Sequence, residues 1–357
     1  MKKRVLSGIR ATGRLHLGNY LGAVKGMLEL QDDPSYETFY MVADVHTITT
    51  PYNIEELRKN RREIILDYLA AGLDPEKSVL FQQANVPEHL ELAFFFSSVT
   101  TIAKMQHLPT FKDKVKQYPE HATLALLNYP ALMAADILVY KAELVPVGID
   151  QEPHLEVARE IARRFNQDFG TDFPEPQRFA TKGEYVPSLT GEGKMSKSVD
   201  GSFINLTDDL ETIKSKIAKI PTDSGRGHIE QDMQDVQDKN EPGKFTRIIR
   251  TDKFINEDGN RSLGVETLYQ MVSLFMGEEN AETLKELYDG GSGIKYGEVK
   301  SKLSQAIFAE LSAFQGRRVE LENNPEYVNQ VIKQGTDKAR SAAYETLKDI
   351  KEKMGLA

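Results

Sequence analysis

The sequence predicts an α/β protein in two parts, a parallel sheet flanked by helices and a second part that is mainly helical. Short β-rich runs alternate with helical patterns through the first half, which is typical of a doubly wound parallel sheet. After residue 200 the β-rich runs fade and helical patterns continue to the C-terminus. These observations favour a Rossmann-type sheet with a mainly helical C-terminal domain. Functional residues are expected at the carboxyl ends of its strands, where such sheets bind ligands.

Four runs in the first half are predicted strands, and three of them lead into predicted helices. The run at 38–49 is continuous and apolar, as expected for a strand that is buried on both faces. The helix that begins at Ile54 is strongly periodic and is expected to end at Gly72 and Pro75. The predicted strands are 4–9, 38–49, 78–84 and 144–150, and the other predicted helices are 19–31 and 152–166.

The second half contains weaker signals. The stretch "TDDLETIKSKIAKI" begins with a helix N-cap signal at Thr207 or Asp208. Residues 225–262 are polar, which predicts loops or an insertion, and "YDGGSGIKYG" at 288–297 interrupts the later helical patterns. The expected domains are 1–203 with the sheet, 204–335 with helices, and a C-terminal helix at 336–357.

The composition is that of an ordinary globular protein and excludes several kinds of site. The 357 residues carry 45 Lys and Arg against 54 Asp and Glu, so non-specific nucleic-acid binding is unfavourable, although a local basic patch could bind RNA. The absence of cysteine excludes disulfides, iron–sulfur clusters and thiolate zinc sites. No apolar run is long enough to span a membrane, and the N-terminal segment lacks the apolar core of a signal peptide. We therefore expect a cytoplasmic protein.

Two stretches suit the binding of phosphate. The stretch "GEGKMSKSVDG" at 191–201 places two lysines and two serines between glycines, which suits a mobile loop that closes on an anion. A solvated surface loop is the alternative. In "SGIRATGRLHLGNYLGA" at 7–23, His16 and Asn19 flank "LG" where a turn passes into a helix, and amides at a helix N-terminus favour phosphate. His16 could also be only a turn or capping residue.

A carboxylate stands in the strongly apolar segment "YPALMAADILVYKAELVPVG". A buried carboxylate is costly unless it is paired or hydrogen-bonded, so Asp136 either caps a helix, forms an ion pair, or accepts a hydrogen bond from a ligand. Gly148 and Asp150 follow at a predicted strand end, where a carboxylate suits ribose hydroxyls. The spacing of His154 and Glu156 does not put both on one helix face, so no metal site is predicted.

These motifs carry a resemblance to a known family. "TGRLHLGNY" followed by "KMSKS" resembles the two signatures of class I aminoacyl-tRNA synthetases, with HLGN in place of HIGH. "YPALMAADILVY", "VPVGIDQEPHLEVAREIARRFN" and "KARSAAYETLKDIKEKMGL" are similar to its tryptophan-specific members. The resemblance implies an enzyme that activates L-tryptophan with ATP, releasing pyrophosphate, and transfers tryptophan to tRNA(Trp). It also implies Mg²⁺ with ATP, a homodimer, and anticodon contacts from 204–335.

The reaction agrees with the tools that the sequence offers. The amino-acid carboxylate attacks the α-phosphate while negative charge builds on the phosphates, so catalysis is mostly positioning and electrostatic stabilisation. Lys112 and Lys114 match lysines that assist the phosphates, or they form an exposed helix face. The resemblance assigns catalysis to Lys194, Lys197, His16, Asn19, Lys112 and Lys114. Further expected ATP-binding residues are Arg10, Thr12, Gly18, Gly148, Asp150, Met195, Ser196 and Ser198.

The resemblance also implies a pocket for the amino acid. Asp136 would accept the indole N–H, which is a donor only, and Tyr129 and Gln151 would hold the α-amino group. Phenylalanine would be rejected partly because it leaves Asp136 unpaired. The apolar members line a slot for the flat ring or are ordinary core, and the histidine is otherwise structural. The expected tryptophan-binding residues are Leu6, Gly8, His46, Tyr129, Met133, Asp136, Val145, Val147 and Gln151.

Some positions depart from the family pattern or remain open. Ala11 replaces a frequent proline, and Leu6 replaces a frequent aromatic residue, so the indole could lose a stacking partner. The apolar stretch 90–105 is a candidate dimer interface or simply core. Basic residues of the C-terminal part could contact RNA or form a solvated surface: Lys295, Lys300, Lys302, Arg317, Arg318, Lys333, Lys338 and Arg340.

Three other functions stay open: a tyrosyl-tRNA synthetase, a small nucleotidylyltransferase with the same motifs, and a non-catalytic paralogue. Asp136 favours indole over phenol. The long helical part argues against a small nucleotidylyltransferase. The intact lysines argue against a paralogue, because a binding-only protein needs no transition-state contacts. The chain contains no tryptophan, which fits an enzyme that must be made when charged tRNA(Trp) runs out, although chance also explains it.

Overall fold

The computed structural model describes residues 2–180, 185–197, 199–223, 233–237, 245–249, 262–289 and 293–357. The chain forms two compact units. The first comprises Met1–Leu15, Asn19–Glu184 and Phe314–Ala357, and the second comprises His16–Gly18 and Tyr185–Ala313. None of the helices in these described ranges combines the length and the apolarity needed to span a bilayer.

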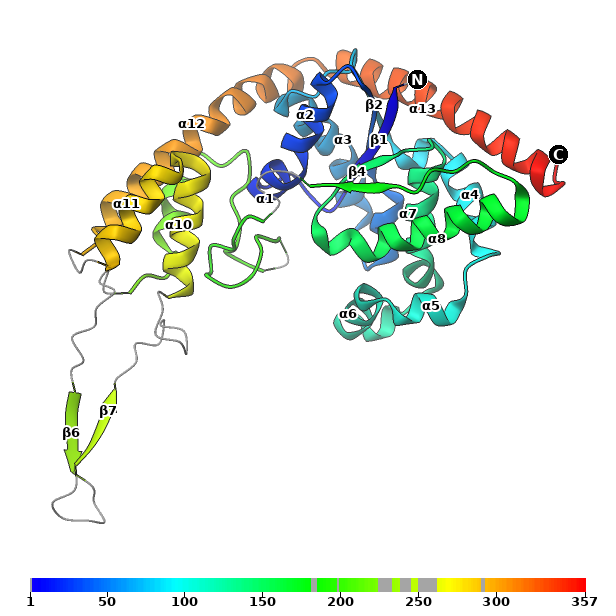
Figure 1. The fold of residues 1–357 in the computed structure, drawn as a ribbon. Coiled ribbons are helices and arrows are strands. Elements are labelled where there is room, and N and C mark those ends of the chain that lie inside the picture. The colour runs from blue at the N-terminus through cyan, green and yellow to red at the C-terminus, as the bar shows by residue number, and fades with distance from the viewer. Residues whose placement is uncertain are drawn as a thin grey trace. The chain divides into compact units, whose positions relative to one another are not determined.

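A five-stranded parallel sheet forms the centre of the first unit, with the strand order β3-β2-β1-β4-β5 (Figure 1). The chain adds β2 and β3 on one side of β1, and then β4 and β5 on the other. This reversal is the mark of a doubly wound sheet, so the predicted fold class is confirmed. The strands are β1 Lys3–Arg10, β2 Tyr36–Ala43, β3 Ser78–Gln82, β4 Leu144–Pro146 and β5 Gln177–Phe179.

The predicted second strand is too long. β2 ends at Ala43, and the following residues form the 3₁₀ helix η2, Val45–Thr49, instead of more strand. Asp44 stabilises this change of direction, because its buried carboxylate accepts hydrogen bonds from Arg61 Nε at 2.5 Å and from the Ala84 amide at 2.8 Å. The apolar run 38–49 therefore continues past the end of β2, and the composition of this run does not show where the strand ends.

The strands on the other side of β1 also differ from the prediction. β4 ends at Pro146 rather than at residue 150, and a 3₁₀ helix, η5, covers Ile149–Gln151. β5 was not predicted. It has three residues, which is too short to show an alternating pattern.

The helices of the first half begin and end where local signals place them. The Asn53 side chain accepts a hydrogen bond from the Glu56 amide and so caps α3, and Gly72 ends α3 with φ 111°, as predicted. One predicted helix, 19–31, is interrupted by a π-helical segment, η1 Tyr20–Val24. The helices are α1 Leu17–Asn19, α2 Lys25–Asp32, α3 Ile54–Ala71, α4 Glu88–Ser97, α5 Ile102–His107, α6 Pro109–Gln117, α7 Leu124–Leu138 and α8 Glu152–Phe169.

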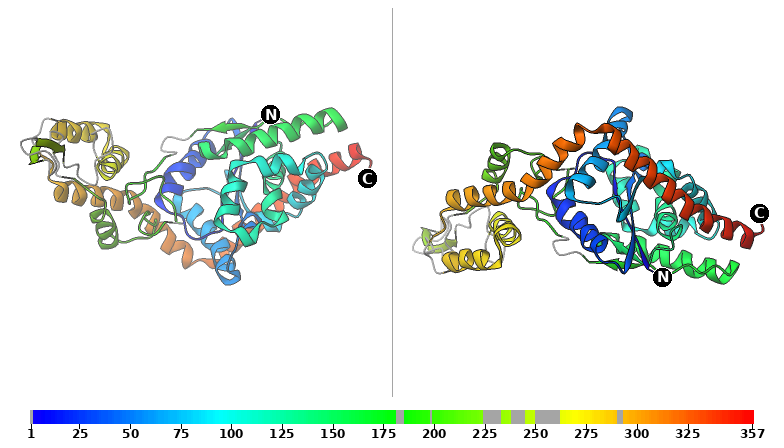
Figure 2. Two further views of the ribbon diagram at one scale, coloured as in Figure 1. Left: turned by 90° about the horizontal axis from the view of Figure 1, so that it is seen from below. Right: turned by 90° about the horizontal axis from the view of Figure 1, so that it is seen from above.

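The C-terminal helix α13, Pro325–Met354, belongs to the first unit and is the red helix in both views of Figure 2. It packs directly on β3. A Cβ atom added to Gly335 would lie 1.8 Å from the carbonyl oxygen of Leu80, so only glycine permits this approach. The expected domain boundary between residues 335 and 336 therefore falls inside one helix and is wrong.

The second unit contains the helices α9 Leu210–Ala218, α10 Leu263–Met276 and α11 Glu278–Asp289, and the first part of α12, Tyr296–Glu322. The helix cap expected at Thr207 or Asp208 is instead Asp209, whose side chain accepts from the Thr212 amide at 2.8 Å. The polar stretch 225–262 lies mostly outside the described residues. Its described parts form an antiparallel pair, β6 Met233–Gln237 and β7 Phe245–Ile249.

Candidate active site

Asp136 is the centre of a buried polar cluster in the first unit. It lies on α7, and its side chain is 0% exposed. Oδ1 accepts hydrogen bonds from Gln83 Nε2 at 2.7 Å and from His89 Nδ1 at 2.6 Å, and Oδ2 accepts from His46 Nε2 at 2.7 Å. Gln83 and His46 follow β3 and β2, so the cluster lies at the carboxyl edge of the sheet, where functional residues were expected.

This cluster keeps Asp136 ionised. Burial alone would raise the pKa of Asp136, but the hydrogen bonds from His46 and His89 outweigh it, and the pKa lies below its usual value. An ionised carboxylate only accepts, so His89 carries a proton on Nδ1, and its Nε2 is hydrogen-bonded to the Tyr140 hydroxyl at 2.7 Å. Burial raises the pKa of Tyr140, so this hydroxyl stays protonated.

Tyr129 belongs to a second polar cluster, which joins three helices. Its hydroxyl donates to Thr110 Oγ1 at 2.7 Å and lies 2.5 Å from His154 Nε2. Burial and, to a smaller extent, the nearby His46 lower the pKa of His154 to about 4, so His154 is neutral near pH 7. The rings of Tyr129 and His46 meet edge-on with their centroids 6.2 Å apart. The two clusters are therefore neighbours.

Arg10, at the end of β1, supports the same region. It donates to the carbonyl oxygen of His46 at 2.9 Å and to Thr50 Oγ1 at 3.0 Å. Burial lowers the pKa of Arg10, and the pKa of Lys114 is lowered by its burial and by the charge of Arg10. Two of the expected ATP-contacting cations are thus near each other. Lys112, which is also expected to contact ATP, is exposed on α6, in agreement with the alternative of an exposed helix face.

The apolar residues expected around the ring divide into two groups. Leu6 and Val145 lie inside the hydrophobic core, whereas Met133 and Val147 are partly buried against it. Gly8 packs against β2, because a Cβ atom there would lie 2.6 Å from Met41 Cγ. The need for glycine at position 8 therefore has a packing reason that is independent of any ligand.

Five further expected residues lie on the segments after β1 and β4. Thr12 is exposed in the turn after β1, and Asn19 is half-buried at the end of α1. After β4, Gln151 Nε2 donates to Asp150 Oδ2 at 2.7 Å. Gly148 precedes this pair in an extended conformation, with ψ 160°.

The KMSKS stretch, which was expected in the sheet domain, belongs to the second unit. Its backbone is attached to the chain just before it, because the Met195 amide donates to the carbonyl oxygen of Val186 at 2.8 Å and the Ser188 amide donates to that of Gly193 at 2.9 Å. Gly193 has φ 72°, a left-handed conformation that favours glycine.

The side chains of this stretch have different exposures. Lys194 is exposed, Lys197 and Ser196 are half-buried, and Met195 is buried. The Ser202 hydroxyl donates to the carbonyl oxygen of Ser196 and holds the end of the stretch. Ser198 lies outside the described residues.

The first signature meets the second within this unit. A Cβ atom added to Gly18 would lie 2.9 Å from His16 Cε1 and 3.4 Å from Met195 Cβ, so the histidine ring and the loop both pack on Gly18. Burial, together with the charges of Lys197 and Lys194, lowers the pKa of His16 to about 4. The structure therefore brings a neutral histidine together with the two lysines that the sequence assigned to phosphate.

Comparisons with known proteins agree with this arrangement. The model of the family described as tRNA synthetases class I (W and Y) matches residues 1–312. The chain belongs to this family. A tryptophan–tRNA ligase from Fusobacterium nucleatum is 38% identical over 99% of this chain and 98% of its own length, and one from Porphyromonas gingivalis is 36% identical over 98% of each. A tryptophanyl-tRNA synthetase from Campylobacter jejuni, solved with ADP and tryptophan, has 31% identity and a TM-score of 0.77 over 99% of this chain and 100% of that one.

Membership of the class I synthetases narrows the alternatives. The match extends through α10, α11 and most of α12, so the helical part is included in the family model. This argues against a small nucleotidylyltransferase, which would not need these helices. Both W and Y enzymes remain within the family description. The sequence relatives at 36–38% identity are named tryptophan–tRNA ligases.

Several residues around the synthetase site were not assigned to it from the sequence. Gln83, His89 and Tyr140 surround Asp136 or its partners, and Thr110 and His154 hold Tyr129. A signal existed for two of them, because Gln83 lies near the end of the predicted strand 78–84 and His89 follows it, and the carboxyl end of this strand belongs to the functional edge of the sheet. No local pattern marks the others.

Three of the basic residues considered for RNA contact have structural partners instead. Arg318 is 2% exposed and pairs with Asp67 and Glu63, and Arg317 donates to the carbonyl oxygen of Ala70. Lys300 donates to carbonyl oxygens after α9, at 3.1 and 2.7 Å. Only Arg318 is buried, so the prediction of a solvated surface is wrong for Arg318 alone, since a charge pattern in sequence does not reveal burial.

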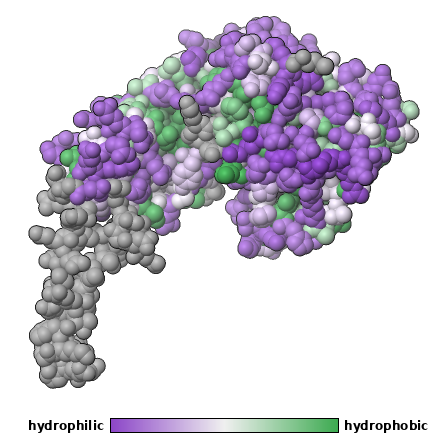
Figure 3. Space-filling model, viewed as in Figure 1, coloured by the Kyte–Doolittle hydropathy of each residue, from purple (hydrophilic) through white to green (hydrophobic). Residues whose placement is uncertain are grey.

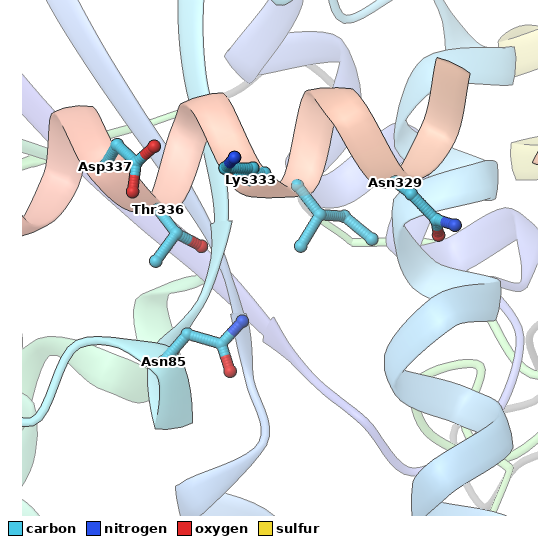
Figure 4. A pocket seen from close by; sticks show the side chains of 6 residues that line it. Asn85, Asn329, Lys333, Thr336 and Asp337 are labelled. Atoms are coloured by element: carbon cyan, nitrogen blue, oxygen red, sulfur yellow. The ribbon is translucent and has the colours of Figure 1, made fainter. Parts of the chain in front are cut away.

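A cavity of about 310 Å³ lies between Asn85 and one side of α13, away from the residues assigned to ATP or tryptophan (Figure 4). Among the described residues, the buried Oγ1 of Thr336 has no hydrogen-bond partner there. Lys333, one of the basic residues considered above, borders this cavity. The cavity is lined by Asn85, Asn329, Ile332, Lys333, Thr336 and Asp337.

Proposed function

We propose that this chain is a tryptophan–tRNA ligase, which activates L-tryptophan with ATP to tryptophanyl-adenylate and pyrophosphate and then charges tRNA(Trp). The observation that carries the choice of amino acid is the ionised, buried Asp136. Among the described residues, Oδ2 accepts a hydrogen bond from His46, and a carboxylate oxygen accepts about two. An indole N–H can fill the remaining site.

The amino acid is held at both ends. Tyr129 and Gln151 bind the α-amino group, and the apolar residues around Met133 and Val147 contact the ring. A phenylalanine ring would leave the Oδ2 site without a donor, and a buried polar group without its partner costs about 1–3 kcal/mol. Selection among aromatic amino acids then follows from the hydrogen bond rather than from size alone.

Activation transfers the adenylyl group of ATP to the carboxylate of tryptophan. A carboxylate oxygen of tryptophan attacks the α-phosphorus of ATP, the bond to the bridging oxygen breaks, and pyrophosphate leaves with both electrons. Lys194 and Lys197 stabilise the charge that grows on the phosphates, and Mg²⁺ arrives with ATP and neutralises part of that charge. Burial keeps the pKa of His16 at about 4, so His16 acts as a neutral hydrogen-bond donor toward a phosphate oxygen.

The remaining ATP contacts are assigned by the same proposal. Asn19, Gly18, Arg10, Thr12 and Lys114 contact ATP. In addition, Gly148 and Asp150 hold the ribose, and Lys112, Met195, Ser196 and Ser198 complete the set.

We also propose a homodimer in the cytoplasm. Four large apolar side chains of the first unit are exposed: Leu90 by 49%, Phe94 by 76%, Ile102 by 65% and Leu124 by 81%. Three of them lie in or beside the stretch 90–105 that the sequence marked, and Figure 3 shows apolar residues among hydrophilic ones over α5 and α6. A second copy of the chain would cover them. The helical second unit is proposed to contact the anticodon.

ATP–pyrophosphate exchange with purified protein, Mg²⁺ and each of the twenty amino acids tests the proposal. Exchange with tryptophan alone is expected, followed by charging of tRNA(Trp). Exchange with tyrosine would move Asp136 to a phenol-binding role. No exchange with any amino acid would indicate a family member that has lost the chemistry.

A further inference from the structure

We propose that His89 is a positioning residue for tryptophan recognition, which holds Asp136 so that Oδ2 is left for the indole N–H. This inference rests on the proposed function. His89 belongs to neither signature and was not marked by the sequence. Its role follows from the positions of its two ring nitrogens.

The ring of His89 is buried and is hydrogen-bonded at both nitrogens. It is 0% exposed on the first turn of α4, and its nitrogens lie 2.6 Å from Asp136 Oδ1 and 2.7 Å from the Tyr140 hydroxyl. Phe81 meets the ring at 5.9 Å between centroids, and Phe39 stacks on Tyr140 at 4.5 Å. Because the ionised carboxylate of Asp136 only accepts, Nδ1 of His89 carries a proton, which points at Oδ1 of Asp136.

This arrangement divides the two oxygens of Asp136 between different tasks. Oδ1 accepts from both His89 and Gln83, which fills its two lone pairs, whereas Oδ2 accepts from His46 and keeps one place. Gln83 is itself oriented, because its Oε1 accepts from the amide of Val45 at 3.1 Å. Without the donor at position 89, Oδ1 would have a free lone pair and the carboxylate would no longer be held in one orientation.

The loss of His89 would also change the charge of Asp136. The titratable groups that face this carboxylate are His46 and His89, and Tyr140 and Glu88 stand behind His89, with Glu88 paired to Arg340 at 3.3 Å. One of the two hydrogen bonds that lower the pKa of Asp136 would be gone, while its burial would remain. A protonated Asp136 could donate to the phenol oxygen of tyrosine, so discrimination against tyrosine would fall.

The test compares two substitutions at the same position. His89→Leu removes the donor at similar volume, and His89→Asn places an amide N–H₂ near the position of Nδ1. We expect His89→Leu to raise KM for tryptophan about 10- to 100-fold in pyrophosphate exchange, with KM for ATP within about twofold of the wild type. His89→Asn should recover most of this loss. Tyr40→Phe is the control for the loss of a buried hydrogen-bonding group elsewhere in the first unit. It removes the Tyr40 hydroxyl, which donates to the Met27 carbonyl oxygen.

Three results would overturn the inference: an unchanged KM for tryptophan in folded His89→Leu, an Asn variant no better than the Leu variant, or equal changes in KM for ATP and tryptophan. If His89→Leu does not fold, Tyr140→Phe decides. It should raise KM for tryptophan about 2- to 5-fold, because the relay is weakened but Nδ1 can still donate, and no change would contradict the role. Failure of the proposed function would appear in the wild type, as exchange with another amino acid or none.

Discussion

At the residue scale, the site depends on polar side chains that are buried and hydrogen-bonded to one another. The sequence left three roles open for Asp136, namely helix cap, ion-pair partner or ligand acceptor. In the structure it caps no helix, and it is bonded to two histidines and a glutamine. Its remaining lone pair is on Oδ2, which agrees with a role as acceptor. The neutral state of His16 and His154 follows from burial in the same way.

The lysines of the second signature are expected to act on the transition state. Lys194→Ala and Lys197→Ala should each lower kcat of pyrophosphate exchange by about 10²–10³-fold, while tryptophan binding by calorimetry changes less than about threefold. The reason is that charge grows on the phosphates only as the reaction proceeds. Lys59→Ala, at an exposed position of α3, is the control and should keep full activity. Equal losses in kcat and in tryptophan binding would refute this role.

At the scale of elements, helix ends follow from local sequence, whereas helix packing does not. Asn53 and Gly72 bound α3 through interactions within a few residues, and the sequence predicted the end at Gly72. The close approach of α13 to β3 joins Gly335 and Leu80, which are far apart in the chain. Gly335 and Gly316 look alike in sequence, as single glycines inside helices.

These two glycines provide a test of that difference. Gly335→Ala would place Cβ 1.8 Å from a backbone oxygen, so we expect it to lower the free energy of unfolding by more than about 2 kcal/mol. At Gly316 nothing lies within 4 Å of an added Cβ, so Gly316→Ala should be neutral or stabilise by up to about 1 kcal/mol. Urea unfolding followed by circular dichroism measures both. Similar effects of the two substitutions would show that α13 does not pack on β3 in this way.

At the scale of the whole molecule, buried charges connect segments that are distant in the chain. Arg318 of α12 pairs with Asp67 and Glu63 of α3, and Asp67 Oδ2 also accepts from the Leu15 amide at 2.8 Å, in the turn that leads to the first signature. Burial raises the pKa of Asp67 to about 6, although the charge of Arg318 opposes this shift. The cluster thus holds α12 and the signature turn on the same helix.

Removing this arginine should reduce stability in a pH-dependent way. Arg318→Met leaves the buried Asp67 without its paired cation, whereas Glu63 keeps its pair with Arg14 at 3.0 Å, so we expect a loss of about 3–5 kcal/mol in the free energy of unfolding at pH 7.5. The pKa of Asp67 is raised by folding, so its contribution is present at low pH and is lost as pH rises through about 6. The variant raises this pKa further, and its deficit should therefore be smaller at pH 5. Arg58→Met, in an exposed pair with Glu55, is the control and should cost less than about 0.5 kcal/mol. A deficit that does not depend on pH would contradict the assignment.

The sequence by itself determined the fold class, four of the five strands, the bounds of α3 and the family, because these depend on periodicity, on caps and on two signature motifs. It also marked Asp136, since a carboxylate in an apolar run needs a partner. Only the tertiary structure decided who that partner is, where β2 ends, and that Arg318 is buried. Hydrogen bonds between His89 and Asp136 or between Arg318 and Asp67 join residues that are 47 and 251 positions apart, and no local pattern records such a distance.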